Sequence, residues 1–156
     1  MANIVSLEEL KRLHVPAKRL FGLDLGSKTI GIAVSDGGLS IATPYHTIRR
    51  TKFTADVAEL AKLAARENIC ALVLGMPLNM DGSEGPRAQS TRAFVRNMAG
   101  KLDLPVLLWD ERLSSVAAEE SMIEAGVKRD KRARHIDAVA AAIILQGALD
   151  RLSKLP

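Results

Sequence analysis

Four acidic residues in three separate parts of the chain are the side chains best suited to chemistry. Asp24 interrupts an apolar run and Asp137 precedes one, whereas Asp110 and Glu111 directly follow a third. An unpaired carboxylate beside a core is costly, so such acids need a cation. Carboxylate oxygens suit Mg2+ or Mn2+, and two such ions can activate water and stabilise the leaving oxygen of a phosphodiester displacement. We therefore predict a nuclease site in which Asp24, Glu111 and Asp137 bind the metal, with Asp110 in support.

Each acid also has an ordinary structural explanation. Asp24 could accept backbone hydrogen bonds at a strand end, and Asp137 could simply favour a helix N-terminus through the macrodipole. Asp110 or Glu111 could pair with Arg112. Because successive strand residues point to opposite faces, we expect only one of Asp110 and Glu111 to reach the metal, and the spacing does not say which.

Basic residues favour an anionic partner. Lys and Arg number 22 against 18 Asp and Glu, and the formal net charge is +4. The densest basic cluster comes just before Asp137, where it is either a solvated loop or a clamp on backbone phosphates. Pro86, Arg87 and Ser90 open a predicted helix whose N-terminus suits another phosphate. The predicted nucleic-acid-binding residues are Lys28, Arg87, Arg112, Lys128, Arg129, Lys131, Arg132 and Arg134.

A nucleotide-binding alternative comes from residues 22–29. They nearly match the P-loop pattern G-x-x-x-x-G-K-[ST], with Ser27 in place of the second glycine. That motif requires a helix next, whereas 30–34 has the pattern of a strand. We therefore interpret Lys28 and Thr29 as hairpin residues.

The elements that position these acids follow from the apolar patterns. Short apolar runs bounded by turn residues indicate strands, and runs with helical spacing and capping residues indicate helices. The order βββαβαβαα predicts an α/β protein with a mixed five-stranded sheet and helices on both faces. Its strand ends should gather the acids in one crevice. The expected elements are a helix near 7–13, strands at 20–25, 30–34 and 40–48, a helix capped by Thr54 and ending near 67, a strand at 69–74, a helix from 86 to about 101, a strand at 105–109, a helix from 114 or 115 to 126, and a last helix containing Asp137.

Length and composition limit the other possibilities. We divide the 156 residues into an accessory arm, 1–17, and one domain, 18–156. The single cysteine, Cys70, forms no internal disulfide, and three scattered histidines offer no zinc-type spacing. No apolar run approaches the roughly 20 residues of a membrane span. The N-terminus has no hydrophobic signal sequence, so we expect a cytoplasmic protein without membrane contact.

Four stretches together make the chain similar to the YqgF/RuvX group of RNase H-like proteins, called pre-16S rRNA nucleases or Holliday-junction resolvase-like proteins. They are GLDLGSKTIGIAVSD at 22–36, GMPLNMDGSEGPRA at 75–88, DERLSSVAAEE at 110–120 and IDAVAAAIILQGALD at 136–150. The resemblance implies an RNase H-like fold, a divalent metal and an endonuclease that processes the 5′ end of precursor 16S rRNA. It also implies Asp24 as the first-strand acid, Asp110 or Glu111 as the second, and Asp137 as the last-helix acid.

Two other functions remain open at this point. One is a Holliday-junction resolving DNA endonuclease, for which a homodimer would match the two-fold substrate. The other is a nucleic-acid-binding module without catalysis. The expected partner is nucleic acid, either precursor rRNA in a ribosomal particle or a DNA junction, and the chain is expected to be a monomer or a homodimer.

Overall fold

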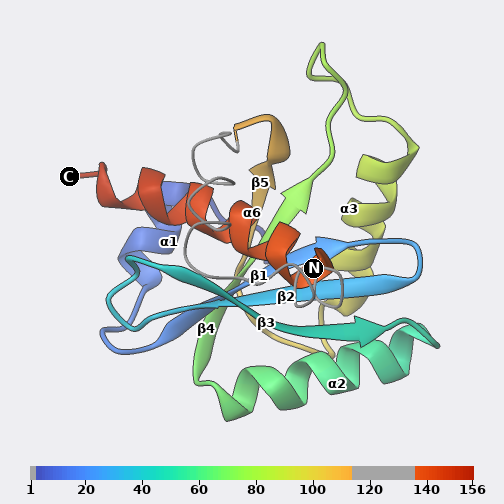
Figure 1. Cartoon of the computed structure of the whole chain (residues 1–156), viewed down its shortest axis with the longest axis horizontal. Helices are drawn as coiled ribbons and strands as arrows, with labels where there is room; N and C mark the ends of the chain where they lie inside the picture. The colour runs from blue at the N-terminus through green and yellow to red at the C-terminus, as the bar shows by residue number, and fades with distance from the viewer. Residues whose placement is uncertain (1–2, 114–135) are drawn as a thin grey trace.

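The computed structural model describes residues 3–113 and 136–156 (Figure 1). The predicted helix from 114 or 115 to 126 and the basic cluster at 128–134 lie outside the described residues. The elements in chain order are α1 (Leu7–Leu13), β1 (Arg19–Leu25), β2 (Thr29–Ser35), β3 (Ala42–Arg49), α2 (Phe53–Arg66), β4 (Ile69–Met76), α3 (Pro86–Met98), β5 (Val106–Asp110), the 3-10 turn η1 (Glu111–Leu113) and α6 (Ile136–Ser153).

The five strands form one mixed sheet in the order β3-β2-β1-β4-β5, as predicted. β1 pairs antiparallel with β2 and parallel with β4, so the chain direction changes beside β1. The hairpin between β1 and β2 closes tightly, since the Gly26 N–H donates to the Thr29 carbonyl over 2.8 Å. A strand therefore begins at Thr29, where a P-loop would need the start of a helix.

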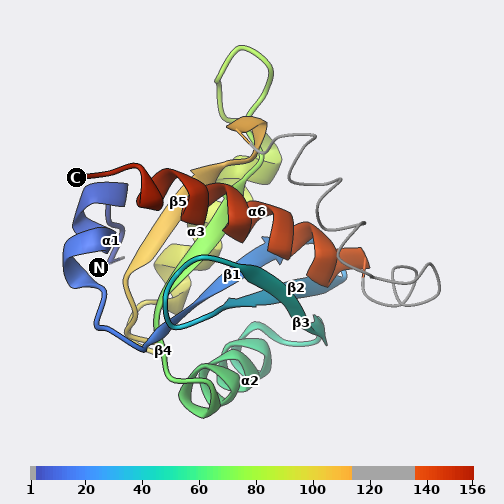
Figure 2. The ribbon, with the colours of Figure 1, turned by 60° about the vertical axis from the view of Figure 1, so that its left-hand side comes forward.

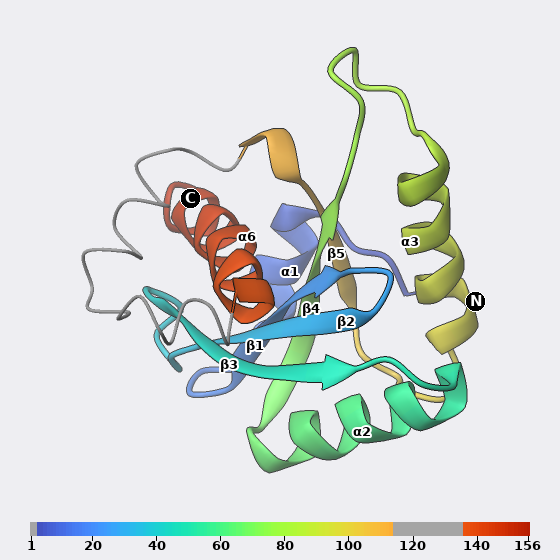
Figure 3. The ribbon, with the colours of Figure 1, turned by 45° about the vertical axis from the view of Figure 1, so that its right-hand side comes forward.

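Helices cover both faces of this sheet, as predicted. α6 crosses one face, while α2 and α3 lie on the other (Figures 2 and 3). Successive residues of β1 point to opposite faces of the sheet. Leu20 packs in the cluster that contains α6, whereas Phe21 and Leu23 pack in the cluster that contains α2 and α3. Gly22 and Asp24 consequently share the α6 side.

The N-terminal segment belongs to the core on the α6 side. Val5 and Leu10 are buried in the same cluster as α6, and the Lys11 ammonium donates to the Leu152 carbonyl over 3.1 Å. Ser6 and Glu9 form the predicted capping box at the start of α1. The division of the chain at residue 17 stays a prediction. Among the described helices, none is long and apolar enough to cross a lipid bilayer.

Two local predictions were wrong. Thr54 does not cap α2; the N-cap is Lys52, and its side chain makes no capping hydrogen bond. Instead, the Thr51 N–H donates to the Asp56 carboxylate over 3.1 Å, which ties the entering chain to the first turn. α3 ends at Met98 rather than near residue 101, and the chain turns at Gly100 with a positive φ of 87°.

Candidate active site

Asp24 lies near the carboxyl end of β1, directly opposite Gly31 of β2. The first turn of α6 rests on that glycine, since a Cβ on Gly31 would lie 1.9 Å from the Asp137 carbonyl oxygen. Only a residue without a side chain permits this approach. Gly31 has no side chain and therefore lets the start of α6 approach β2, which brings Asp137 close to Asp24 although the two are far apart in the chain.

Thr29 orients the carboxylate of Asp137. Its hydroxyl donates to a carboxylate oxygen of Asp137 over 2.8 Å. The sequence had indicated only a hairpin role for Thr29, because nothing in the local pattern connects β2 with a residue so far along the chain. The hydroxyl of Thr29, in the predicted hairpin link a few residues after Asp24, was the available signal.

Glu111 reaches the same side of the sheet from the end of β5. A Cβ on Gly75 of β4 would lie 2.5 Å from a Glu111 carboxylate oxygen and 2.5 Å from the Ile144 side chain on α6. Gly75 thus makes room for Glu111 between β4 and α6. The 3-10 turn that begins at Glu111 directs this residue, and not Asp110, toward Asp24.

The electrostatics identify Asp24, Glu111 and Asp137 as one cluster, which we call the acid site. Burial raises the pKa of Asp24, the Asp137 carboxylate raises it further, and Arg87 opposes both effects. Burial and the Asp24 carboxylate also raise the pKa of Glu111, and Arg87 again opposes the shift. Partly buried like charges that destabilise one another call for an additional cation.

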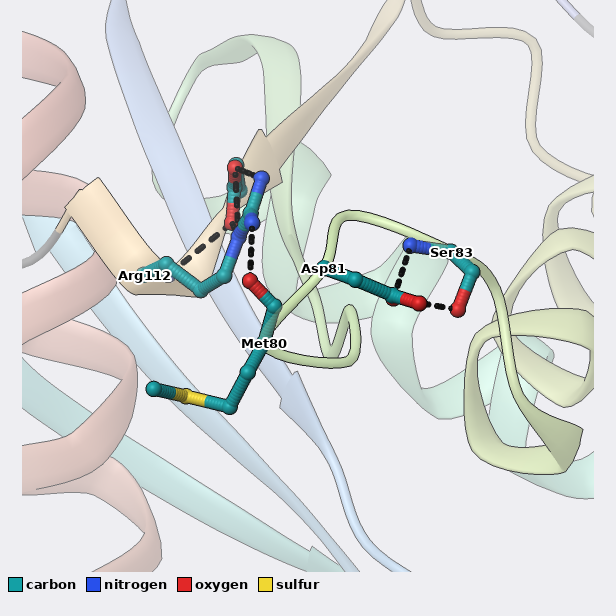
Figure 4. Close-up of polar contacts among 5 residues, drawn as sticks. Met80, Asp81, Ser83 and Arg112 are labelled. Atoms are coloured by element: carbon teal, nitrogen blue, oxygen red, sulfur yellow. Dashed lines mark hydrogen bonds and ion pairs between the residues drawn. The ribbon is translucent and has the colours of Figure 1, made fainter.

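Asp110 has a different environment although it is the next residue in the chain. Its carboxylate accepts from the Arg112 guanidinium, with a shortest distance of 2.7 Å, and this hydrogen bond lowers the pKa of Asp110. Arg112 also donates to the Met80 carbonyl over 3.2 Å, while Ser83 binds Asp81 in the same loop (Figure 4). We call Asp110, Arg112 and the Met80 carbonyl the loop brace, because they fix the loop between β4 and α3.

The donor set of the acid site consists of carboxylate oxygens, which is the chemistry preferred by Mg2+ and Mn2+. Within residues 3–113 and 136–156, no three His, Cys, Asp or Glu side chains meet closely enough to hold a metal ion as they stand. The raised pKa values of Asp24 and Glu111 nevertheless fit a bound divalent cation, whose charge would offset both carboxylates.

The predicted basic residues divide into three groups. Lys28 is exposed in the β1–β2 turn, and Arg87 is exposed in the first turn of α3, where its charge acts on the acid site. Arg112 belongs to the loop brace. The cluster of Lys128, Arg129, Lys131, Arg132 and Arg134 lies outside the described residues.

One basic residue near the acid site was missed. Arg50 follows β3 and lines a pocket of about 180 Å3 together with Arg87 and residues of the β1–β2 turn. The pair Arg49–Arg50 at the end of a predicted strand was a weak signal. Nothing in the spacing connects Arg50 with α3, because the contact depends on how the sheet and α3 pack.

Comparison with known proteins gives a family match and several similar proteins. A family model described as "RuvX: Holliday junction resolvase" matches residues 18–151. A protein of Rhizobium meliloti (strain 1021), named "Putative pre-16S rRNA nuclease", is 59% identical over 152 residues, which cover 97% of this chain and 92% of that protein. A protein of Cereibacter sphaeroides with the same name is 59% identical over 150 residues, covering 96% and 94%.

Solved structures with a similar fold include two resolvases. Thermus thermophilus RuvC in complex with a Holliday junction matches with a TM-score of 0.52 and 16% identity, covering 86% of this chain and 96% of that one. The yeast mitochondrial Holliday junction resolvase Ydc2 matches with a TM-score of 0.52 and 15% identity, covering 94% and 85%. These likenesses confirm the predicted RNase H-like fold. With the family model and the relatives, they confirm the resemblance found in the sequence: the chain belongs to the RuvX family.

Proposed function

We propose that this protein is a divalent-metal-dependent endonuclease that processes the 5′ end of precursor 16S rRNA. The observation that carries the proposal is the acid site, where Asp24, Glu111 and Asp137 come from three distant parts of the chain. Membership of the RuvX family and the names of the relatives support a nuclease with this substrate. We place the activity in the cytoplasm, with a ribosomal particle as partner.

The residues of the acid site and their neighbours would bind the metal, position a ligand and bind the substrate phosphate. Asp24, Glu111 and Asp137 would hold Mg2+ or Mn2+, and Thr29 keeps the Asp137 carboxylate in position through its hydrogen bond. When bound, the metal supplies Lewis-acid stabilisation of the developing negative charge and a reactive water for in-line displacement. Arg87 stands beside the carboxylates and can bind a phosphate oxygen that they alone would repel.

Asp110 is not a ligand in this proposal. Its carboxylate is already neutralised by Arg112, so a cation gains little by binding there. We therefore assign the second acid of the site to Glu111. Arg112 is assigned to the support of the loop between β4 and α3 rather than to nucleic-acid binding.

A second candidate function is resolution of Holliday junctions. The description of the family model names that activity, and the similar solved structures include resolvases. The same acid site would serve, since both reactions hydrolyse a phosphodiester. A junction is two-fold symmetric, so this alternative needs a homodimer that presents two sites.

One experiment tests these alternatives together. Precursor 16S rRNA and a synthetic four-way DNA junction are incubated with wild-type protein, Asp24→Asn and Asp110→Asn, in Mg2+, in Mn2+ and in EDTA. We expect metal-dependent cleavage of the rRNA that Asp24→Asn abolishes and Asp110→Asn retains. Cleavage of the junction alone would establish the alternative function. A folded wild-type protein that binds nucleic acid but cuts neither substrate with either metal would contradict the nuclease proposal.

A further inference from the structure

The pocket beside the acid site has a composition suited to an anion. It lies between the β1–β2 turn, the residue after β3 and the first half of α3. Two arginines, Arg50 and Arg87, line it together with small polar residues and the apolar Leu25 and Phe94, and no acidic residue is among the described residues of its wall. Its volume of about 180 Å3 corresponds to roughly six water molecules. The charge that lines this pocket is therefore positive, opposite to that of the acid site.

Arg50 is held in place by the fold. Its guanidinium Nη1 donates to the Gly26 carbonyl over 2.6 Å, and its backbone N–H donates to the Lys28 carbonyl over 2.8 Å. The guanidinium carbon lies 5.7 Å from the centroid of the Phe94 ring, which is itself buried. These contacts fix the planar group while using a small part of its five N–H donors. A preorganised guanidinium loses little rotamer freedom when an anion binds.

Arg87 connects the pocket with the acid site. Its side chain is exposed on the first turn of α3, and its charge lowers the pKa values of both Asp24 and Glu111. The same residue therefore borders two spaces, one lined by arginines and one lined by carboxylates.

We propose that this pocket binds a backbone phosphate of the substrate strand adjacent to the phosphodiester that is cut, with Arg50 and Arg87 as its charged donors. The inference rests on the proposed nuclease function and extends it by naming the element that fixes the register of the strand. Because the contact is to phosphate, it positions RNA and DNA alike and reads no base.

Binding is tested without cleavage, in EDTA, by fluorescence anisotropy of a fluorescein-labelled single-stranded RNA and of a DNA with the same sequence. We expect Arg50→Gln to raise the Kd for both by roughly tenfold and to reduce the slope of log Kd against log salt by about one. The matched control is Arg96→Gln, the same change at an exposed position near the end of α3 and outside the pocket. It should change the Kd by no more than about twofold, because screening removes distant charge effects.

A second measurement locates the phosphate. The phosphates of the DNA are replaced one at a time by uncharged methylphosphonate. We expect one position at which the replacement weakens binding to wild type but not binding to Arg50→Gln. At that position the Arg50 guanidinium would interact with the negative charge of the phosphate, and removing either partner removes the same interaction. Arg87→Gln, at an exposed side chain, repeats the measurement at the second arginine of the pocket if Arg50→Gln is poorly folded.

The outcomes separate this inference from the function on which it rests. Equal effects of Arg50→Gln and Arg96→Gln in a wild-type protein that cuts nucleic acid would overturn the pocket and leave the nuclease intact. Sensitivity to methylphosphonate that persists unchanged in both pocket variants would also overturn it. A wild-type protein that neither binds the oligonucleotides nor cuts any substrate would overturn both proposals. Stronger loss with RNA than with DNA would contradict a contact made to phosphate alone.

Discussion

The acid site and the loop brace lie side by side at the end of β5 and differ in how their charges are balanced. Glu111 turns toward α6, where burial and Asp24 raise its pKa. Asp110 precedes it by one residue and receives an arginine from its own loop, which lowers its pKa. Both carboxylates belong to the DER triplet at 110–112. Their opposite environments follow from the fold, because β5 ends between them.

The difference teaches which carboxylate is available for function. In the loop brace the opposite charge is supplied by the chain itself, so the interaction is complete and serves to hold the loop. In the acid site the described residues supply Arg87 against several carboxylates, so the folded protein tolerates an excess of negative charge. Such unbalanced charge destabilises the chain and is retained where a ligand restores the balance. The following predictions test that contrast.

The largest effect is expected for Asp24→Asn. The change removes a metal ligand, so cleavage should fall by at least about a hundredfold. It also removes a charge that is disfavoured in the folded state, so the free energy of unfolding at neutral pH should rise by about 0.5–2 kcal/mol. Cleavage assays and urea denaturation measure the two quantities on the same preparation. A variant that cuts normally, or that is less stable than wild type, would contradict the assignment.

The direct test of the contrast is the pair Glu111→Gln and Asp110→Asn. Each replaces a carboxylate by the amide of the same shape, at neighbouring positions. Glu111→Gln should reduce cleavage about a hundredfold, whereas Asp110→Asn should remain within a few-fold of wild type, because Arg112 already neutralises Asp110. Initial rates at saturating metal give the comparison. A larger loss from Asp110→Asn would reverse the roles that we assign to the two acids.

Stability should respond strongly where α6 rests on the sheet. Gly31→Ala would place a methyl group 1.9 Å from the Asp137 carbonyl oxygen, so α6 must shift away from β2. We expect a loss of about 1–3 kcal/mol in the free energy of unfolding and weaker cleavage, since Asp137 moves with the helix. Gly38→Ala is the control, because the nearest neighbour of its added methyl group would be a carboxylate oxygen of Asp36 at 3.4 Å, an ordinary contact distance. Equal stability of the two variants would show that α6 does not depend on this contact.

Much of the fold was predictable because its signals are local. The hairpin follows from two short apolar runs joined by a few turn residues, and the capping box at Ser6 and Glu9 is visible within four residues. Pro86 at the start of α3 is a further local signal. By contrast, the predicted start of α2 was wrong. The first turn of this helix is held by a hydrogen bond from the Thr51 N–H to the Asp56 carboxylate, and not by a side-chain cap at Thr54.

The candidate site was predictable in its residue types but not in its contacts. The acids stood out because carboxylates beside apolar runs are costly. The choice between Asp110 and Glu111 depends on where β5 ends and η1 begins, and strand ends are poorly specified by sequence. Gly31 lies inside the predicted strand at 30–34 and Gly75 directly follows the predicted strand at 69–74. Glycine at such positions permits close approach of another chain segment, but only the fold shows which segment approaches.

The smallest predicted effect concerns the loop brace and its dependence on pH. Because Arg112 lowers the pKa of Asp110 in the folded state, the pair stabilises the protein above the pKa of an unfolded Asp, about 3.9, and the contribution is lost as the pH falls through the lower folded pKa. Arg112→Gln should therefore lower the free energy of unfolding only slightly at neutral pH, because the Arg112 side chain is exposed and solvent screens the pair, and the deficit should narrow below about pH 4.

Asp24→Asn should behave in the opposite sense in the same urea titrations. Its pKa is raised in the folded state, so the wild-type carboxylate becomes protonated at a higher pH than Asp110 does. The advantage of Asp24→Asn should thus be full above the folded pKa of Asp24 and should shrink as the pH falls through that value. It should be gone below the pKa of an unfolded Asp, about 3.9, where the deficit of Arg112→Gln only begins to narrow. The stability differences of Asp24→Asn and Arg112→Gln from wild type could instead have the same sign, or vanish in the reverse order as the pH falls. Either result would show that the acid site and the loop brace do not differ in charge balance. The basis for choosing Glu111 over Asp110 would then be lost.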